Sequence, residues 1–473
     1  MKKNGKNKKL FFCLIGLIVS FSLFMTLFFQ LEPDYLWHIK VGEYMFHNGL
    51  IKHDIFSWIV KGKYWVNHEW LFEVMLYGLK TIFGQYHIFV YLFLSLILLL
   101  GLLFLLNYES FKKNISFSLL FLLFFFILAN GFIQARPHLI HFSLLAFTVY
   151  VLYDLYSNKD SKKIYFLPIV TILWANLHGG SSNLPYLLCF LFFIGGFFSF
   201  KFSKVESIRL SNKQLCKYFF VMILCMISVC INIHGFKMFF YPYVNILDST
   251  MISNISEWRA TSLHDVYHYT YYLFLLFVIV VMLFSSKRIR FIDLLLFILG
   301  TYLGLKSIRF WLYIYIFMSY SIFYYVRNRS LDKGTCLSIV ISSLTLISIF
   351  LIYCGRVINV SYDNYLDKKV ISIIKERKPK KLYNMYNYGG ELIYNDILVF
   401  IDGRADLYGK YNYKDYLDIS VLQKNSISLI KKYDFDYFLV DSSYPIATYL
   451  KTNKKYELIY HSEKVFLYYK KNS

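Results

Sequence analysis

The residues best suited to acid–base chemistry are gathered in one stretch, from Glu32 to Trp70, directly after the first apolar run. Asp34 lies near its start, and His38 follows four residues later. If this segment is helical, the two side chains share one face, and the imidazole can orient the carboxylate as a general base. Aspartate is also a favoured helix N-cap. We favour the catalytic interpretation of Asp34, because the cluster of ionisable residues continues downstream.

Two further groups in the same stretch offer carboxylates and metal ligands. Asp54 follows a histidine and is either a second catalytic carboxylate or a turn-forming residue. The pair His68 and Glu69 opens an amphipathic segment. Together with Asp34 it has the imidazole and carboxylate ligands that bind divalent cations, but such a pair also serves as a polar cap. A divalent cation is therefore possible, and the cofactor stays unassigned.

The elements that must position these residues are membrane helices. The chain has 473 residues, of which 57% are hydrophobic, and its mean hydropathy is +0.46. Apolar runs recur along it, each near the ~20 residues that cross a bilayer, and backbone in lipid must be helical. The net charge of +22 falls mostly in short loops between these runs. It indicates positive-inside topology and contact with anionic lipid, so we exclude nucleic acid as a partner.

Loop charge then predicts the topology. A basic N-terminus precedes the first helix, so we place it in the cytoplasm. Alternation then gives about eleven transmembrane helices, of which the eleventh covers about Leu337–Cys354. The loop 32–84 and the region 356–473 then both lie outside the cytoplasmic membrane. The first domain is predicted to cover residues 1–355, including that loop. The second, residues 356–473, is interpreted as a small extracytoplasmic α/β domain. Helical segments separate its strand-like runs, which are Lys381–Tyr386, Leu398–Asp402, Tyr437–Asp441, Glu457–His461 and Val465–Tyr469. The seven cysteines indicate neither a zinc site nor a disulfide framework.

Cationic residues mark the predicted outer ends of several helices. Arginine at that interface can bind a phosphate group with two parallel hydrogen bonds. Snorkelling or an ion pair with a loop carboxylate explains each residue singly as well. The predicted substrate-binding residues of these outer ends are Arg136, His178, Glu257, Arg259 and Arg309.

A second polar motif lies in the predicted outer α/β domain. Asp402, Arg404 and Asp406 follow a strand-like run and surround a glycine. Strand ends in α/β domains commonly carry binding residues. These three residues either bind the acceptor, dock the domain onto the membrane core, or form a turn with an Asp–Arg ion pair.

The order of these motifs resembles that of GT-C glycosyltransferases, which are polytopic membrane enzymes with polyprenyl-phosphate sugar donors. The resemblance covers nearly the whole chain and suggests an uncharacterised bacterial branch of that class. It implies that Asp34 matches the acidic residue of the first outer loop, taken there as the base that activates the acceptor. His68 and Glu69 match the end of that loop, although this sequence lacks the prolines found there. The motifs that carry the resemblance are Asp34…Trp37-His38, Asn67-His68-Glu69-Trp70, Gln134-Ala135-Arg136-Pro137, Trp174-Ala175-Asn176-Leu177-His178-Gly179-Gly180, Ser256-Glu257-Trp258 and Phe400-Ile401-Asp402-Gly403-Arg404.

These observations predict an inverting transfer of a sugar from a polyprenyl-phosphate donor to an acceptor outside the cell membrane. Asp34 is the expected base, and arginines neutralise the leaving phosphate. One alternative is a ligase or polymerase of cell-surface polysaccharide with a diphosphate-linked donor. The other is a non-enzymatic transporter or scaffold. A transporter is less consistent with the sequence, because charges cluster at helix ends rather than in mid-span, and no inverted repeat is visible.

Overall fold

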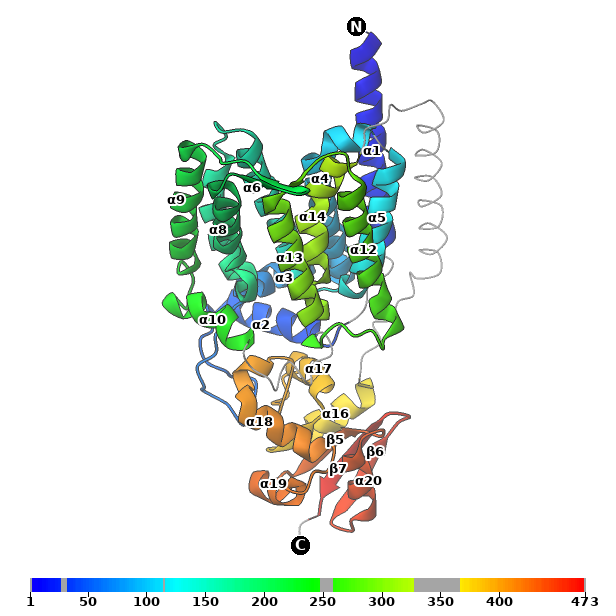
Figure 1. Cartoon of the computed structure of the whole chain (residues 1–473). Helices are drawn as coiled ribbons and strands as arrows, with labels where there is room; N and C mark the ends of the chain where they lie inside the picture. Colours follow the sequence, from blue (N-terminus) through cyan, green and yellow to red (C-terminus); the bar gives the residue numbers. More distant parts are fainter. Residues whose placement is uncertain (1, 27–31, 114, 247–257, 327–365, 472–473) are drawn as a thin grey trace. The chain divides into compact units, whose positions relative to one another are not determined.

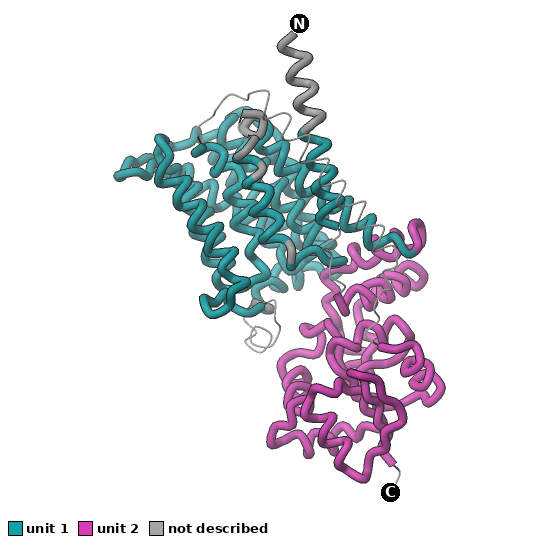
Figure 2. Tube along the Cα trace, turned by 90° about the vertical axis from the view of Figure 1, so that its right-hand side faces the viewer, with its two compact units in different colours: residues 1–30, 85–244, 252–359 teal, residues 31–84, 245–251, 360–473 magenta. Residues whose placement is uncertain are grey.

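The computed structural model describes residues 2–26, 32–113, 115–246, 258–326 and 366–471 (Figure 1). The chain divides into two compact units (Figure 2). Unit 1 comprises residues 1–30, 85–244 and 252–359, and unit 2 comprises residues 31–84, 245–251 and 360–473. The loop 32–84 therefore groups with the C-terminal region, whereas the sequence-based division places it in a first domain of residues 1–355.

Unit 1 is mainly helical. Its α-helices are α1 (Lys2–Thr26), α4 (His87–Lys113), α5 (Ile115–Ala129), α6 (His138–Ser157), α7 (Leu167–Leu177), α8 (Leu184–Phe197), α9 (Asn212–Val229), α10 (Phe236–Ile246), α12 (Tyr269–Phe284), α13 (Phe291–Lys306) and α14 (Trp311–Tyr325). Short 3-10 helices connect them, namely η2 (Asn130–Phe132), η3 (Lys163–Phe166), η4 (Gly179–Ser181), η6 (Val266–His268) and η7 (Ile308–Phe310), and η1 (Gly84–Tyr86) precedes α4. A small sheet contains β1 (Phe200–Phe202), β2 (Val205–Ser207) and β3 (Ile289–Arg290) in that order.

Five stretches of the described residues are long and apolar enough to cross a membrane. They are Trp70–Tyr108, His138–Ser157, Gly179–Phe197, Asn212–Val229 and Val266–Phe284, and shorter apolar helices cover Leu14–Thr26, Leu120–Ala129 and Lys163–Leu177. The eleventh predicted span, residues 337–354, lies outside the described residues. The number of crossings therefore stays a prediction.

Glycines and one buried ion pair determine how the helices of unit 1 pack. A Cβ on Gly300 would overlap Ile314, so α13 and α14 approach closely at this point. At the start of α13, Asp293 accepts two hydrogen bonds from the Arg290 guanidinium, at 2.7 and 3.0 Å. The hydroxyl of Tyr153 also donates to Asp293, at 2.7 Å. This fully buried carboxylate is thus paired and hydrogen-bonded, which offsets its desolvation.

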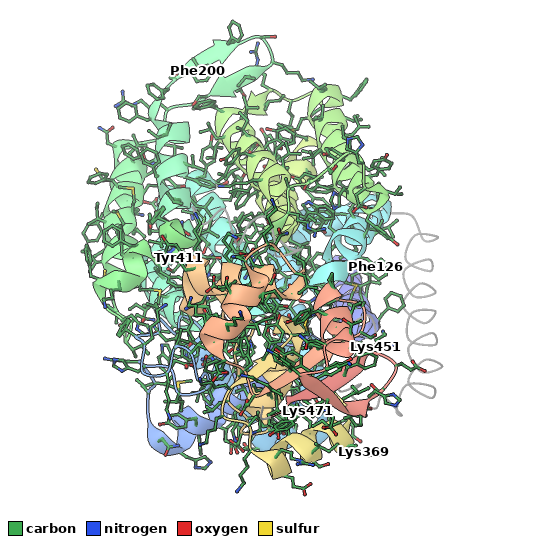
Figure 3. All side chains as sticks on the ribbon, turned by 90° about the horizontal axis from the view of Figure 1, so that it is seen from below. Phe126, Phe200, Lys369, Tyr411, Lys451 and Lys471 are labelled. Carbon is green, nitrogen blue, oxygen red and sulfur yellow. The ribbon has the colours of Figure 1, made fainter. Side chains whose placement is uncertain are left out.

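Unit 2 contains a four-stranded sheet with helices around it. Its strands are β4 (Leu382–Asn384), β5 (Tyr437–Asp441), β6 (Tyr456–His461) and β7 (Val465–Lys470), in the order β4-β5-β7-β6. The β4–β5 pair is parallel and the other two pairs are antiparallel. The helices are α2 (Tyr35–Asn48), α3 (Trp70–Phe83), α16 (Lys368–Arg377), η8 (Tyr386–Tyr388), α17 (Gly389–Tyr394), α18 (Ala405–Ser420), α19 (Ser426–Tyr433) and α20 (Pro445–Thr452). Exposed side chains of this unit include Lys369, Tyr411, Lys451 and Lys471, which Figure 3 labels.

The first loop contributes two helices to unit 2. Gly42 of α2 lies against the backbone of Glu73 in α3, and a Cβ at this position would overlap the Glu73 carbonyl group. This close approach brings the polar faces of α2 and α3 together. Between the helices the chain folds back on itself, with the Asp54 amide donating to the Lys63 carbonyl at 2.9 Å.

The loop between α2 and α3 packs into the C-terminal part of unit 2. The Trp58 indole nitrogen donates to the Leu382 carbonyl of β4 at 3.0 Å. Its ring packs on Phe400 and Phe435, with centroids 5.7 and 5.9 Å apart. Ser57 forms a parallel bridge with Val399. The predicted strand 398–402 is thus an extended segment that pairs with the loop and does not join the sheet.

Candidate functional site

Asp34 occupies the N-cap position of α2, but its carboxylate makes no capping hydrogen bond. Its backbone carbonyl accepts from the His38 amide at 3.2 Å, as at any helix start. The carboxylate lies instead against Gly403, where a Cβ would overlap it. The Glu32 carboxylate accepts from the Asp34 amide at 3.1 Å, which anchors this position from the other side. Asp34 is 8% exposed, so its side chain is almost completely buried.

His38, which follows Asp34 by four residues, forms a largely buried cluster with carboxylates at the start of α3. The Nδ1 atom of His38 lies 3.4 Å from a Glu73 oxygen, and its Nε2 atom lies 3.8 Å from Glu69. Glu69 also lies 3.1 Å from His68 Nε2, so its carboxylate has an imidazole on each side. Asn67 donates to Glu73 at 2.6 Å. The imidazole of His38 therefore lies near the carboxylates of Glu69 and Glu73, and its role in orienting Asp34 stays a prediction.

This cluster supplies the donor types of a divalent-cation site. His68 is partly exposed, while His38 and Glu69 are buried. Imidazole nitrogens and carboxylate oxygens at such separations are common ligands of zinc, manganese and iron. The same residues also lie within ion-pair distance of one another, and the metal assignment stays open, as it does from the sequence.

Asp54 adopts the turn-forming role that was one of its two sequence interpretations. It is completely buried, and its carboxylate accepts from the amides of Phe56 and Ser57, at 3.4 and 2.9 Å. The same carboxylate accepts from the Arg404 guanidinium at 2.7 Å. These contacts are local in part, but the Arg404 bond joins residues that lie 350 positions apart in sequence. Asp54 therefore links the first loop to the C-terminal region.

Arg404 is the centre of this buried network. Its Nε and Nη2 atoms donate to the two Asp402 oxygens at 2.8 and 2.7 Å, and Tyr408 donates to Asp402 at 2.5 Å. Burial alone would lower the pKa of Arg404, but the carboxylates of Asp402 and Asp54 raise it well above its usual value. Burial also raises the pKa of Tyr408, with the Asp402 carboxylate acting in the same direction. The guanidinium thus stays charged, and the phenol stays a donor.

The three motif residues of the C-terminal region differ in exposure. Asp402 and Arg404 are 0% and 2% exposed, and their polar atoms bind each other, as in the turn interpretation. Asp406 is partly exposed in the first turn of α18. Acceptor binding, one of the three sequence interpretations of this motif, stays a proposal for Asp406, the partly exposed member.

The predicted cationic residues of unit 1 lie at helix ends. Arg136 precedes α6 and is partly exposed, and its carbonyl accepts from the Tyr91 hydroxyl. His178 ends α7 and is buried. Arg309 lies over the Trp258 ring, 5.1 Å from its centroid. Arg259 is exposed, and its carbonyl accepts from the Ile308 amide at 3.1 Å. Glu257 lies outside the described residues.

His141 is a polar group of unit 1 that sequence reasoning missed. Both of its ring nitrogens and the indole nitrogen of Trp174 are buried without a hydrogen-bond partner among the described residues. Its ring centroid lies 5.4 Å from that of His178 and 5.2 Å from that of Tyr313. A histidine in an apolar helix is usually interpreted as a core residue. The sequence feature that could have identified His141 is its position about one helical turn after Arg136 and Pro137.

Unit 2 also has a cavity of about 440 Å³ on the other face of α2. Its lining includes Lys40, Glu43 and His47 of α2, with Asp396 opposite. Lys40 pairs with Asp396 at 2.9 Å and with Glu43 at 3.0 Å. None of the residues predicted for substrate binding lines this cavity, so it is separate from the Asp34 face.

Comparison with known proteins identifies the fold. No sequence-family model matches the chain, and no curated protein matches it. Among solved structures, one with a similar fold is the oligosaccharyltransferase of Archaeoglobus fulgidus tethered to an acceptor peptide that contains the NVT sequon. The TM-score is 0.54 at 13% identity over 91% of this chain and 69% of the other. The apo form of that enzyme gives 0.47 at 12% identity over the same shares.

Proposed function

We propose that this protein is a GT-C-type glycosyltransferase of the cell membrane. It transfers a sugar from a polyprenyl-phosphate donor to an acceptor on the extracytoplasmic side. The observation that carries the proposal is the environment of the Asp34 side chain. Asp34 occupies the N-cap of α2, but its carboxylate does not cap the helix and lies against Gly403. The fold supports the proposal, since the chain shares it over 91% of its length with an enzyme that transfers oligosaccharide.

The proposed reaction uses Asp34 as the general base. Its carboxylate removes the proton from the acceptor nucleophile while that atom attacks the anomeric carbon of the donor. The bond from the anomeric carbon to the phosphate oxygen breaks, the lipid phosphate leaves with the electron pair, and the configuration inverts. General-base assistance of this kind contributes about 10²–10⁴-fold in rate.

The proposed role of the cationic residues is to bind the donor phosphate. Arg136, Arg309 and His178 carry the charge or the N–H donors that a leaving phosphate requires. In this scheme Asp54 is a structural residue, because its carboxylate already binds Arg404 and two backbone amides. We retain Asp406 as the acceptor-binding candidate of the C-terminal motif, since it is the partly exposed member.

The test is Asp34→Asn, which keeps the size of the side chain and one oxygen but removes the base. We expect transfer to fall about 10²–10⁴-fold while the protein folds normally. The matched control is Glu32→Gln, which keeps an acceptor oxygen for the Asp34 amide and should retain nearly full activity. The assay follows tritium-labelled sugar from synthetic polyprenyl-phosphate hexoses and pentoses into extracytoplasmic glycan, and rescue of surface glycan in a deletion strain is the second readout. Normal transfer by well-folded Asp34→Asn protein would exclude Asp34 as the base.

The same assay separates the proposed function from a polysaccharide ligase or polymerase. Those enzymes use a diphosphate-linked donor, whereas the proposed reaction releases a lipid monophosphate. Transfer from diphosphate-linked sugars, with none from monophosphate donors, would assign the chain to the alternative class.

A further inference from the structure

We infer that the C-terminal region positions the base, and that Gly403 is the residue through which it does so. This inference rests on the proposed function of Asp34 and assigns to residues 360–473 a part in the reaction itself. Gly403 is a positioning residue that leaves space for the Asp34 carboxylate and holds it at one place. The alternative interpretation of this region is an accessory domain that only packs on the loop.

The contact between Asp34 and Gly403 leaves no space for a side chain at position 403. A Cβ on Gly403 would overlap the Asp34 carboxylate group. The backbone of Gly403 does not have a positive φ, so glycine is not needed there for its conformational freedom. What the position requires is the absence of a side chain, because the carboxylate occupies that space.

Two other glycines bring the same segments together. A Cβ on Gly390 of α17 would overlap the Pro33 carbonyl oxygen, one residue before Asp34. A Cβ on Gly389 would lie 2.5 Å from the Cβ of Asp402 and from the Ile401 oxygen. The start of α17 is therefore packed tightly against both the Pro33-Asp34 segment and the segment that carries Gly403. The position of Asp34 is defined from two directions by the C-terminal region.

The segment that carries Gly403 is itself fixed in place. The Gly403 carbonyl accepts from the Tyr386 hydroxyl at 3.1 Å, and the Arg404 amide donates to Asp402 at 2.9 Å. The Arg404 side chain then binds Asp54 of the first loop at 2.7 Å. Because these partners are buried or partly buried, the Gly403 backbone has little freedom to move away from Asp34.

The effect of Gly403→Ala depends on which atoms the new methyl group would overlap. The atoms that the new methyl group meets are the end of the Asp34 side chain, which can rotate away. At Gly390 the overlap is with backbone, so a substitution there requires a larger shift of the chain. Gly403→Ala therefore displaces the carboxylate and leaves the fold intact. A displacement of about 1 Å in a reacting group costs on the order of 10²-fold in rate.

The experiment compares Gly403→Ala with Gly78→Ala, a control in α3 where a Cβ meets no atom within 4 Å. We expect Gly403→Ala to lower kcat about 10²-fold with an unchanged KM for the labelled polyprenyl-phosphate donor. Gly78→Ala should match the natural protein. The decisive readout is the rate of the double variant Gly403→Ala/Asp34→Asn, which should be no slower than Asp34→Asn alone. Once the carboxylate has been removed, displacing the side chain at position 34 causes no further loss of rate.

A second variant covers the case in which Gly403→Ala unfolds unit 2. Tyr386→Phe removes the hydroxyl that holds the Gly403 carbonyl and adds no bulk. It should lower kcat several-fold in the natural background and have no effect in the Asp34→Asn background. Two results overturn the inference while Asp34→Asn still shows its expected loss. One is a double variant in which the two losses multiply, and the other is normal kcat in both single variants. If Asp34→Asn itself is active, the proposed function fails, and the inference fails with it.

Discussion

The buried network around Arg404 allows a quantitative test of how unit 2 is held together. Arg404→Gln removes the positive charge and leaves the Asp54 and Asp402 carboxylates, both 0% exposed, without a counter-ion. Removing one partner of a buried ion pair typically costs about 3–5 kcal/mol. The Arg404 guanidinium binds both carboxylates through three hydrogen bonds of 2.7–2.8 Å, so the effect should fall in the upper part of that range.

The assay is thermal unfolding of the detergent-solubilised protein, followed by protease cleavage within residues 360–473. For a unit of about 170 residues, each kcal/mol shifts the midpoint by roughly 2–4 °C, so Arg404→Gln should lower it by roughly 6–20 °C. The control is Arg377→Gln at the exposed end of α16, which should shift the midpoint by less than about 2 °C. Adding Asp54→Asn to Arg404→Gln should restore part of the loss, because it removes one uncompensated charge. Equal midpoints for Arg404→Gln and Arg377→Gln would refute the role of this network.

Three further outcomes follow from particular contacts. His141→Ala should lower sugar transfer about 10–100-fold without unfolding unit 1, as expected if its unpartnered nitrogens bind a charged ligand group, and unchanged transfer would contradict this role. Asp293→Asn should lower the unfolding free energy by about 3–5 kcal/mol through loss of the Arg290 ion pair, measured by denaturant titration in micelles, and a change below about 1 kcal/mol would count against it. Cysteines placed at the exposed positions Lys61 and Lys410 should both react with an impermeant maleimide on intact cells, whereas labelling of either one only after permeabilisation would reject the topology.

Local signals in the sequence predict elements well, and long-range pairing decides the rest. The strand predicted at residues 437–441 has the same bounds in the structure, because a short β-branched and aromatic run is a local signal. The turn at Asp54 is likewise one of the two roles that local sequence suggests. Its bond to Arg404 spans 350 residues, and no spacing rule predicts such a partner. The grouping of loop 32–84 with the C-terminal region was missed for the same reason.

The site shows the same division between local and distant information. The chemistry of Asp34 follows from residue type and position, but its partner Gly403 does not, because a glycine carries no functional group to recognise. The sequence predicts His38 as the group that orients Asp34, since i and i+4 share a helix face. His38 also lies 3.4 Å from Glu73 of α3, where the close approach at Gly42 brings the two helices together. Packing between helices therefore places a further carboxylate near the histidine, which the spacing along one helix does not predict.

The composition of unit 2 also constrains the topology of the whole chain. Residues 31–84 and 360–473 fold into one compact unit, and two segments can do this only on the same side of a membrane. The number of crossings between them must therefore be even, which the predicted second to eleventh spans satisfy. A loop of some fifty residues is too short to bury a stable core alone, and Trp58 packs into the core of the C-terminal region instead. The proposed base thus acquires its final geometry only after the last part of the chain has folded onto the first loop.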